Sequence, residues 1–486
     1  MINTNGTQSL TDRTTKGMFW STVERFVTQG SNLLIGIVLA RILPPEAFGQ
    51  IAMLTIFTSL ASLFVDSGFG KALIQRKDKS TIDYSSVFYF NIGIGFISYL
   101  ILFMTAPYIA DFYKTPILSQ LLRYTGLTVI INSFVVVHNA VLTEKLNFKL
   151  IAQINLAAVL ISGCTAIWYA YEGRGVWALV IKNLLQYSLA TILILCLAHW
   201  APRLQFSFHS IKKLFRFGSK LLISGFIYII TGNLSSLLIG RFFHSAQLGY
   251  YTRGAQFSDT LSSTFQSIIL NVSFPALATI SSEHERFVSG ARKMINMGAL
   301  IICPVLLLFA ALAKPFVILV LTDKWLPCVP IIQLLCLARA ITSIGSTNLT
   351  MLQAIGRSDL SLKIDTLKIP LHLIAIFVGV FWGIIGVAIG QVCLSLICFY
   401  LNTYYTKKLF NYGAYEQLKD LKSIFLSLGV MFLTVGAISY LLHLVWLQLF
   451  VGALLGIAVY CGMLYWQKSQ ELQEIVRLSK KLIFGT

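Results

Sequence analysis

The chain has 486 residues, of which 56% are hydrophobic and only 12% are charged, and its formal net charge is +19. Soluble domains carry roughly twice that charged fraction, so the composition excludes an ordinary soluble protein. The net charge alone could suggest nucleic-acid binding. The basic residues lie in short loops between long apolar segments, however, and this distribution argues against a nucleic-acid partner.

A helix needs about 20 apolar residues to cross a bilayer, and such segments recur from Gly17 to Trp466. The sequence therefore predicts an all-α integral membrane protein with about fourteen transmembrane helices. The expected spans are 17–43, 46–70, 84–110, 117–142, 150–171, 174–198, 215–242, 247–275, 288–313, 329–354, 360–381, 383–406, 422–442 and 444–466.

An even number of spans places both termini on one side of the membrane. The Lys and Arg residues of the loops concentrate on that side, as Lys212 and Lys213 illustrate, whereas a loop on the opposite side carries only Lys114. Short cytoplasmic loops are enriched in these residues. We therefore expect both termini to be cytoplasmic. No cleavable signal peptide is expected, since residues 1–16 are polar and the first apolar segment is too long.

A short motif between two expected spans occurs twice, 200 residues apart, and is called the repeated corner below. "RILPPEAFGQ" at 41–50 follows the first span, and "RFFHSAQLGY" at 241–250 follows the seventh. The matching residues are Arg41 and Arg241, Gly49 and Gly249, and Phe57 and Phe257. Composition alone could produce such a likeness. The shared offset favours two parallel six-helix bundles around a central cavity, a geometry suited to alternating access, followed by two extra helices.

The expected domains follow from this repeat. They are a cytoplasmic N-terminal segment (1–16), an N-terminal six-helix bundle (17–198), a basic cytoplasmic linker (199–214), a C-terminal six-helix bundle (215–406), a second cytoplasmic linker (407–421), an extra helix pair (422–466) and a cytoplasmic tail (467–486).

Several expected spans carry ionisable residues, each of which costs roughly 2.5–3.5 kcal/mol to insert and usually faces a cavity. Cations outnumber anions among them, and guanidinium groups bind phosphate through two hydrogen bonds. A pyrophosphate headgroup or an acidic sugar is thus an expected cargo. The expected substrate-binding residues are Arg25, Arg253, Arg339, Lys368, Gln29, Asn32 and Asn271, and the expected ion-coupling residues, for H+ or Na+, are Asp66 and Asp365.

Structural explanations compete with these assignments. Stripes of Ser and Thr on one helix face can join packed helices by hydrogen bonds. Asp365 and Lys368, at i and i+3, could neutralise each other. Arg123 and Lys182 lie near span ends, where their charged groups could reach the interface.

The sequence predicts no enzyme, no metal site and no cofactor. The eight cysteines form no CxxC motif, and the histidines lack metal-ligand spacing. An integral-membrane glycosyltransferase or polymerase usually needs a carboxylate cluster in a sizeable loop. The only close acid pair, Glu283 and Glu285, lies in a short charged loop. A drug or cation antiporter, the other alternative, would favour buried acids over buried arginines.

Two stretches resemble a known family. "KGMFWSTVERFVTQGSNLLIGIVLARILPPEAFGQIAM" and "DSGFGKALIQRKD" are similar to the N-terminal signature of polysaccharide transporters. These are the Wzx-type lipid-linked oligosaccharide flippases of the multidrug/oligosaccharidyl-lipid/polysaccharide (MOP) superfamily. The resemblance is specific from residue 16 to about 80, is diffuse to about 406, and is closest to the colanic acid and teichuronic acid export branch.

The resemblance implies a bacterial inner-membrane flippase. Its cargo would be an oligosaccharide linked to undecaprenyl pyrophosphate, moved from the cytoplasmic to the periplasmic leaflet for exopolysaccharide, capsule or O-antigen synthesis. Membrane lipids, a polymerase and export machinery are the further partners it implies. It also implies cavity arginines in the first and eighth spans, which here are Arg25 and Arg253.

Overall fold

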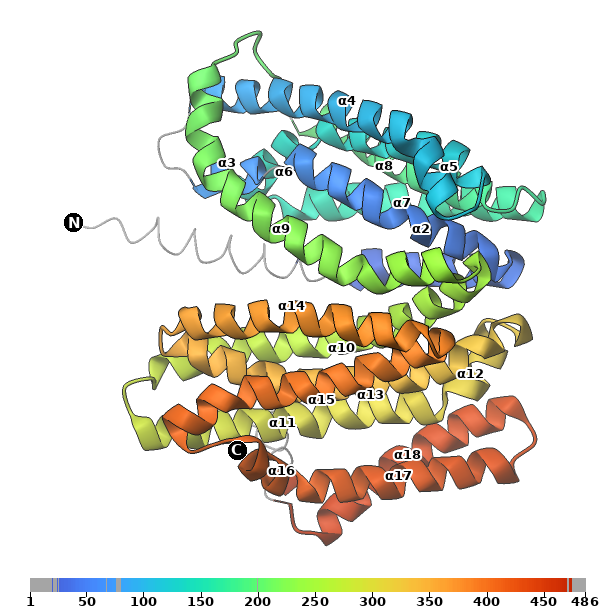
Figure 1. Ribbon diagram of the computed structural model, residues 1–486, viewed down its shortest axis with the longest axis vertical. Coiled ribbons are helices and arrows are strands. Elements are labelled where there is room, and N and C mark those ends of the chain that lie inside the picture. Colours follow the sequence, from blue (N-terminus) through green and yellow to red (C-terminus); the bar gives the residue numbers. More distant parts are fainter. Residues whose placement is uncertain are drawn as a thin grey trace. The chain divides into compact units, whose positions relative to one another are not determined.

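The computed structural model describes residues 20, 24, 26–66, 68–75, 80–198, 200–469 and 472–473. Within these ranges every regular element is a helix. The chain divides into two compact units, Met1–Gly249 and Tyr250–Thr486. The long helices of each unit run side by side (Figure 1).

The first unit opens with an apolar helix over Phe26–Ile42. The helices that follow are α2 (Pro45–Asp66), α3 (Phe69–Gln75), α4 (Thr81–Phe112), α5 (Ile117–Ser133), α6 (Val136–Glu144), α7 (Phe148–Tyr171), α8 (Trp177–Leu197) and α9 (Phe208–Phe242).

Helix α10 (Ser245–Thr279) begins in the first unit and continues in the second. The remaining elements are α11 (His284–Ala311), α12 (Ala313–Val320), the 3-10 helix η1 (Asp323–Cys328), α13 (Val329–Ala354), α14 (Ser358–Val380), α15 (Gly383–Phe410), α16 (Ala414–Asp420), α17 (Lys422–Leu441) and α18 (Val445–Trp466).

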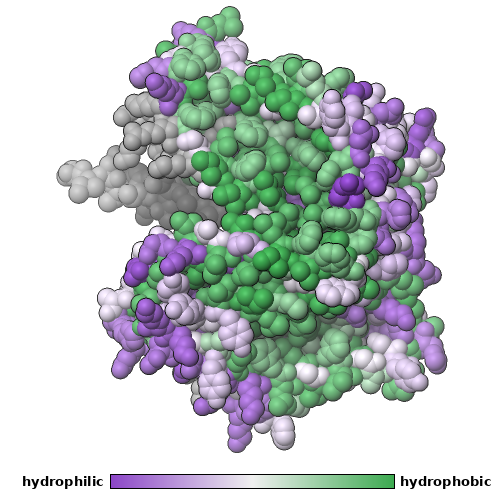
Figure 2. Space-filling view, viewed as in Figure 1, coloured by the Kyte–Doolittle hydropathy of each residue, from purple (hydrophilic) through white to green (hydrophobic). Residues whose placement is uncertain are grey.

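Ten of these helices are long and apolar enough to cross a membrane, and the bent pair of α5 and α6 makes up to eleven. The protein is therefore a multi-pass membrane protein. The other three expected spans coincide with the Phe26–Ile42 helix, which is shorter, and with α10 and α14, which are long enough to cross a membrane but too polar or too charged to count among the ten. Hydrophobic side chains cover the middle of the visible face of each unit, and hydrophilic ones gather at its ends (Figure 2).

The expected span 117–142 is two helices, bent by 42° after Ser133. Side-chain hydroxyls donate hydrogen bonds to backbone carbonyls at this break. Ser133 donates to the carbonyl of Ile130 at 2.6 Å, and Thr191 of α8 donates to that of Ile131 at 3.4 Å. Side chains that insert into a helix ladder in this way are a known cause of kinks. The expected span 46–70 is likewise two helices, α2 and α3.

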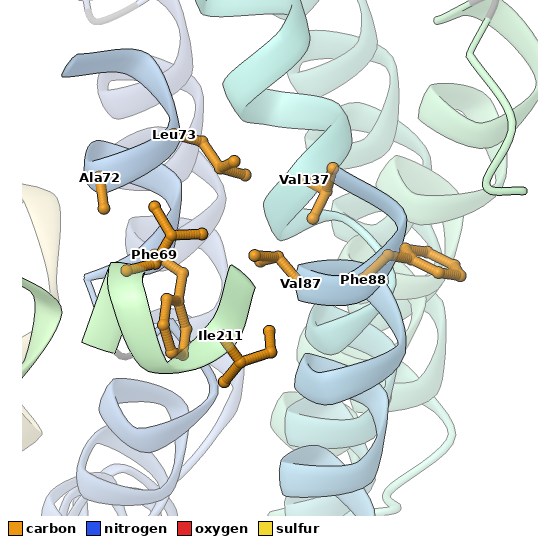
Figure 3. Close-up of a cluster of buried hydrophobic side chains, with 8 residues drawn as sticks. Phe69, Ala72, Leu73, Val87, Phe88, Val137 and Ile211 are labelled. Atoms are coloured by element: carbon orange, nitrogen blue, oxygen red, sulfur yellow. The ribbon is translucent and has the colours of Figure 1, made fainter. Parts of the chain in front are cut away.

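The basic linker expected over 199–214 is shorter than predicted, since α9 begins at Phe208. The first turns of α9 have an apolar side formed by Ile211 and Leu214. These two residues pack into a buried cluster at this end of the unit. Figure 3 shows this cluster, in which α3, α4, α6 and α9 meet around Phe69. The division between units also falls later than the predicted boundary of the bundles, because α9 packs against α2 and α4.

The repeated corner forms a reciprocal contact within the first unit. Gly49 of α2 lies against the carbonyl of Ser245, and Gly249 lies against the carbonyl of Pro45. A Cβ atom at either glycine would overlap the facing carbonyl oxygen. Only glycine therefore permits the two helix starts to approach this closely.

Candidate functional site

The second unit holds an ion pair between two of its long helices, α10 and α13. Nε of Arg339 in α13 donates to Oδ1 of Asp259 in α10 at 2.5 Å, and both side chains are partly exposed. Two polar contacts hold α10 and α13 in register beside it, Ser258 with Cys336 and Ser262 with Ser343, each at 3.4 Å. An accessible charged pair gives these two helices a polar face in an otherwise apolar unit.

Helix α14 carries a second pair and a histidine. Nζ of Lys368 lies 2.8 Å from Oδ1 of Asp365, the i, i+3 pairing that competed with an ion-coupling role. One turn further, Nε2 of His372 lies 3.1 Å from Nε2 of Gln391 in α15. His372 also lies near the guanidinium of Arg339 in α13. Arg339, Lys368 and Asp365 are thus parts of one polar region spread over α10, α13, α14 and α15.

Arg253 occupies a different environment. It lies about two turns from the start of α10, and its residue exposure is only 6%. Its guanidinium carbon is 5.8 Å from the ring centroid of Trp325 in η1, and Nη1 donates to Oε1 of Gln256 at 2.6 Å. In this conformation a ligand would have to displace Gln256 or Trp325 to reach Arg253.

The other expected substrate residues are dispersed. Arg25 lies outside the described residues, and so does the side chain of Asn271. Gln29 is exposed on the first helix. Oδ1 of Asn32 accepts a hydrogen bond from Nζ of Lys182 in α8 at 2.9 Å, which ties the first helix to α8.

Asp66 lines a polar cleft of about 470 Å³ in the first unit. Ser59 and Ser62, which precede Asp66 on α2, lie in the same cleft. The opposite wall comes from either side of the α5–α6 break and supplies Asn132 and Asn139. Acidic side chains within transporters often mark ion pathways. Broken helices in these proteins often contribute to coupling-ion sites. The position of Asp66 beside the α5–α6 break has both features.

Sequence reasoning missed a buried amide network in the second unit. Gln417 of α16 and Asn348 of α13 are both fully buried. Nε2 of Gln417 donates to Oδ1 of Asn348 at 2.7 Å, and Nδ2 of Asn348 donates back to Oε1 of Gln417 at 3.2 Å. Thr406 adds a third bond to Asn348 at 3.2 Å. The linker expected over 407–421 is in fact anchored to α13, and Glu416 begins α16 by accepting a hydrogen bond from the backbone N–H of Gly413 at 2.9 Å.

Comparisons with known proteins agree with this architecture. A family profile described as "Polysaccharide biosynthesis protein" matches residues 38–330. The chain is 28% identical over 397 residues to the lipopolysaccharide biosynthesis protein WzxC of Escherichia coli K12, covering 80% of each chain. It is 29% identical over 367 residues to the teichuronic acid biosynthesis protein TuaB of Bacillus subtilis 168, covering 74% of this chain and 76% of TuaB.

Among solved structures, the fold matches the lipid II flippase MurJ in an inward closed conformation. The TM-score is 0.75 at 16% identity, over 91% of this chain and 97% of MurJ. The fold is thus that of the MOP superfamily.

Proposed function

Because the chain belongs to the polysaccharide biosynthesis protein family, we propose that it moves a lipid-linked oligosaccharide across the bacterial inner membrane. The proposed cargo is an oligosaccharide on undecaprenyl pyrophosphate. The names of the relatives support a role in polysaccharide synthesis, and the fold shared with a lipid II flippase carries the step from that role to a lipid-linked cargo. The proposal involves no enzymatic step.

The proposed architecture has fourteen spans, two six-helix bundles and cytoplasmic termini. Helices occupy all fourteen expected positions within the described residues. The two more polar helices, α10 and α14, carry Asp259, Asp365 and Lys368. Helices that line a water-filled interior have this composition. Alternating access then exposes the polar region of the second unit to each side of the membrane in turn.

Arg339 is the proposed contact for the cargo phosphate. Its guanidinium is accessible and already oriented by a carboxylate, so a phosphate can take the place of Asp259 and accept two hydrogen bonds. That exchange would leave Asp259 to be neutralised by H+ or Na+. Cargo binding and ion binding would then be coupled through one side chain, while Asp66 in its cleft offers a second ion site.

The test is complementation of polysaccharide export in cells that lack their own transporter, with membrane abundance measured in parallel. Arg339→Gln should abolish most export at normal abundance, and Arg339→Lys should keep part of it because lysine lacks the planar fork. Arg286→Gln is the matched control, since Arg286 pairs with Glu283 at the exposed start of α11. Normal export by Arg339→Gln would reject the site.

The coupling ion is tested separately with Asp66→Asn. If the cleft binds the coupling ion, this variant should lose the dependence of export on a proton or sodium gradient while it still inserts normally. Unchanged dependence on both gradients would remove Asp66 from the mechanism and leave the proposed cargo site at Arg339 standing.

A further inference from the structure

A second polar pocket in the first unit has no part in the proposed transport path. It has a volume of about 510 Å³ and lies between α4, α5 and α8. Gln120, Arg123 and Tyr124 of α5 line one side, with Phe103 of α4 and Trp177 of α8 opposite. Arg123 is six residues from the start of α5, so it lies about 9 Å inside that helix end.

Arg123 is the only cation among the residues that line this pocket. Its guanidinium carbon lies 4.4 Å from the ring centroid of Phe103. Nε is buried and has no hydrogen-bond acceptor among the described residues. No carboxylate in the described part of the chain pairs with Arg123. A buried guanidinium N–H without an acceptor is costly, so an anionic partner for the exposed part of the Arg123 guanidinium would be favourable.

The surroundings indicate that this ligand is a lipid. On α4, Leu100, Met104 and Phe103 itself are exposed, and large apolar side chains on the surface of a membrane helix contact acyl chains. Tyr124 and Trp177 pack edge to face, with ring centroids 5.2 Å apart. Tyrosine and tryptophan concentrate at headgroup depth. The cation would therefore face the lipid phosphate, the aromatic pair would lie at the headgroup, and the apolar face of α4 would contact the acyl chains.

We propose that this pocket binds the phosphate of a membrane lipid, with Arg123 as its cationic group and the acyl chains along the exposed face of α4. The amide of Gln120, the hydroxyl of Tyr124 and the indole N–H of Trp177 are the donors available to the phosphate and its polar substituent. The site does not depend on the proposed transport function. An ordinary phospholipid and a polyprenyl phosphate share the chemistry it would recognise.

The experiment uses the purified full chain in detergent and measures bound lipid by native mass spectrometry after addition of phosphatidylglycerol. Arg123→Gln should weaken binding about tenfold or more, the effect of losing a charged hydrogen-bond partner. Arg123→Lys should fall between that variant and the wild type. The matched control is Arg174→Gln, because Arg174 is exposed in the loop that precedes α8 and pairs with Glu172 at 3.6 Å.

Equal lipid binding by wild type and Arg123→Gln would overturn the proposal. Glycerol 3-phosphate competing as well as phosphatidylglycerol would also overturn it, since the acyl chains would then contribute nothing. Stronger binding of undecaprenyl phosphate than of phosphatidylglycerol would identify a polyprenyl lipid as the source of the phosphate. If Arg123→Gln does not fold, Tyr124→Ala replaces it. Tyr124 is half exposed, so this variant should fold and still bind several-fold less lipid.

Discussion

Replacing Gln417 by leucine removes one side of the reciprocal amide pair that anchors α16 to α13. The variant loses the hydrogen bonds of 2.7 and 3.2 Å between Gln417 and Asn348. Each intramolecular hydrogen bond contributes about 0.5–1.5 kcal/mol, so α16 should lose about 1–3 kcal/mol of stability. Oδ1 of Asn348 still accepts from Thr406 at 3.2 Å, and Nδ2 still donates to the carbonyl of Gly345 at 3.4 Å. The full penalty for a buried unsatisfied amide is therefore not added.

Hydrogen exchange of the α16 backbone amides measures this loss directly, because local opening reports local stability. A loss of 1–3 kcal/mol corresponds to exchange about 5- to 140-fold faster. The amide of Leu421, which donates to the carbonyl of Gln417 at 3.0 Å, is a suitable probe. Tyr415→Phe is the matched control on the same helix, since Tyr415 is exposed.

A second variant separates hydrogen bonding from side-chain size. Replacing both Asn348 and Gln417 by leucine removes both partners at once, and such replacements are often nearly neutral. The double variant should therefore exchange more slowly than the sum of the two single effects predicts. Exchange in Gln417→Leu within twofold of the control would refute the reasoning, and so would fully additive single effects.

Three further predictions concern the rest of the chain. Gly49→Ala should destabilise the protein by about 1–3 kcal/mol through overpacking, seen as a lower unfolding temperature, while Gly232→Ala, with open space around it, should be neutral or stabilising. A reporter at Thr486 should be cytoplasmic and one beside Lys114 should lie outside; the same side for both would reject the fourteen-span arrangement. Asp420→Asn should lower the free energy of unfolding by no more than about 1 kcal/mol, because Arg292, its ion-pair partner, is half exposed; a larger loss would make that pair a structural anchor.

The apolar segments predict the helices well, since hydrophobicity and length are properties of a continuous stretch. The positions of all expected spans coincide with helices in the described residues. The breaks were not predictable. The kink after Ser133 depends on Thr191 of α8, which is 58 residues further along the chain, and no local pattern announces that partner.

The candidate site shows the same limit. The residue types and helical spacing identified Arg339, Asp365 and Lys368 as polar positions on spanning helices, and the i, i+3 rule anticipated the contact between the last two. The environment of Arg253 depends on Trp325, a residue of η1 that lies 72 positions further along the chain and that no helical pattern links to Arg253. Sequence patterns give a residue its helix face, whereas only the packing of distant segments gives it neighbours.

The contact at the repeated corner has the form of an isologous interface. Residue 49 lies against residue 245 and residue 249 against residue 45, so each half of the contact is the other shifted by 200 positions. Homodimers with a two-fold axis bury surfaces of this kind, in which one patch meets its own copy. Here both copies belong to one polypeptide. A substitution in one copy therefore perturbs half of the contact and leaves the other half in the same molecule as an internal reference. A symmetric homodimer does not allow this comparison, because every mutation appears in both of its subunits.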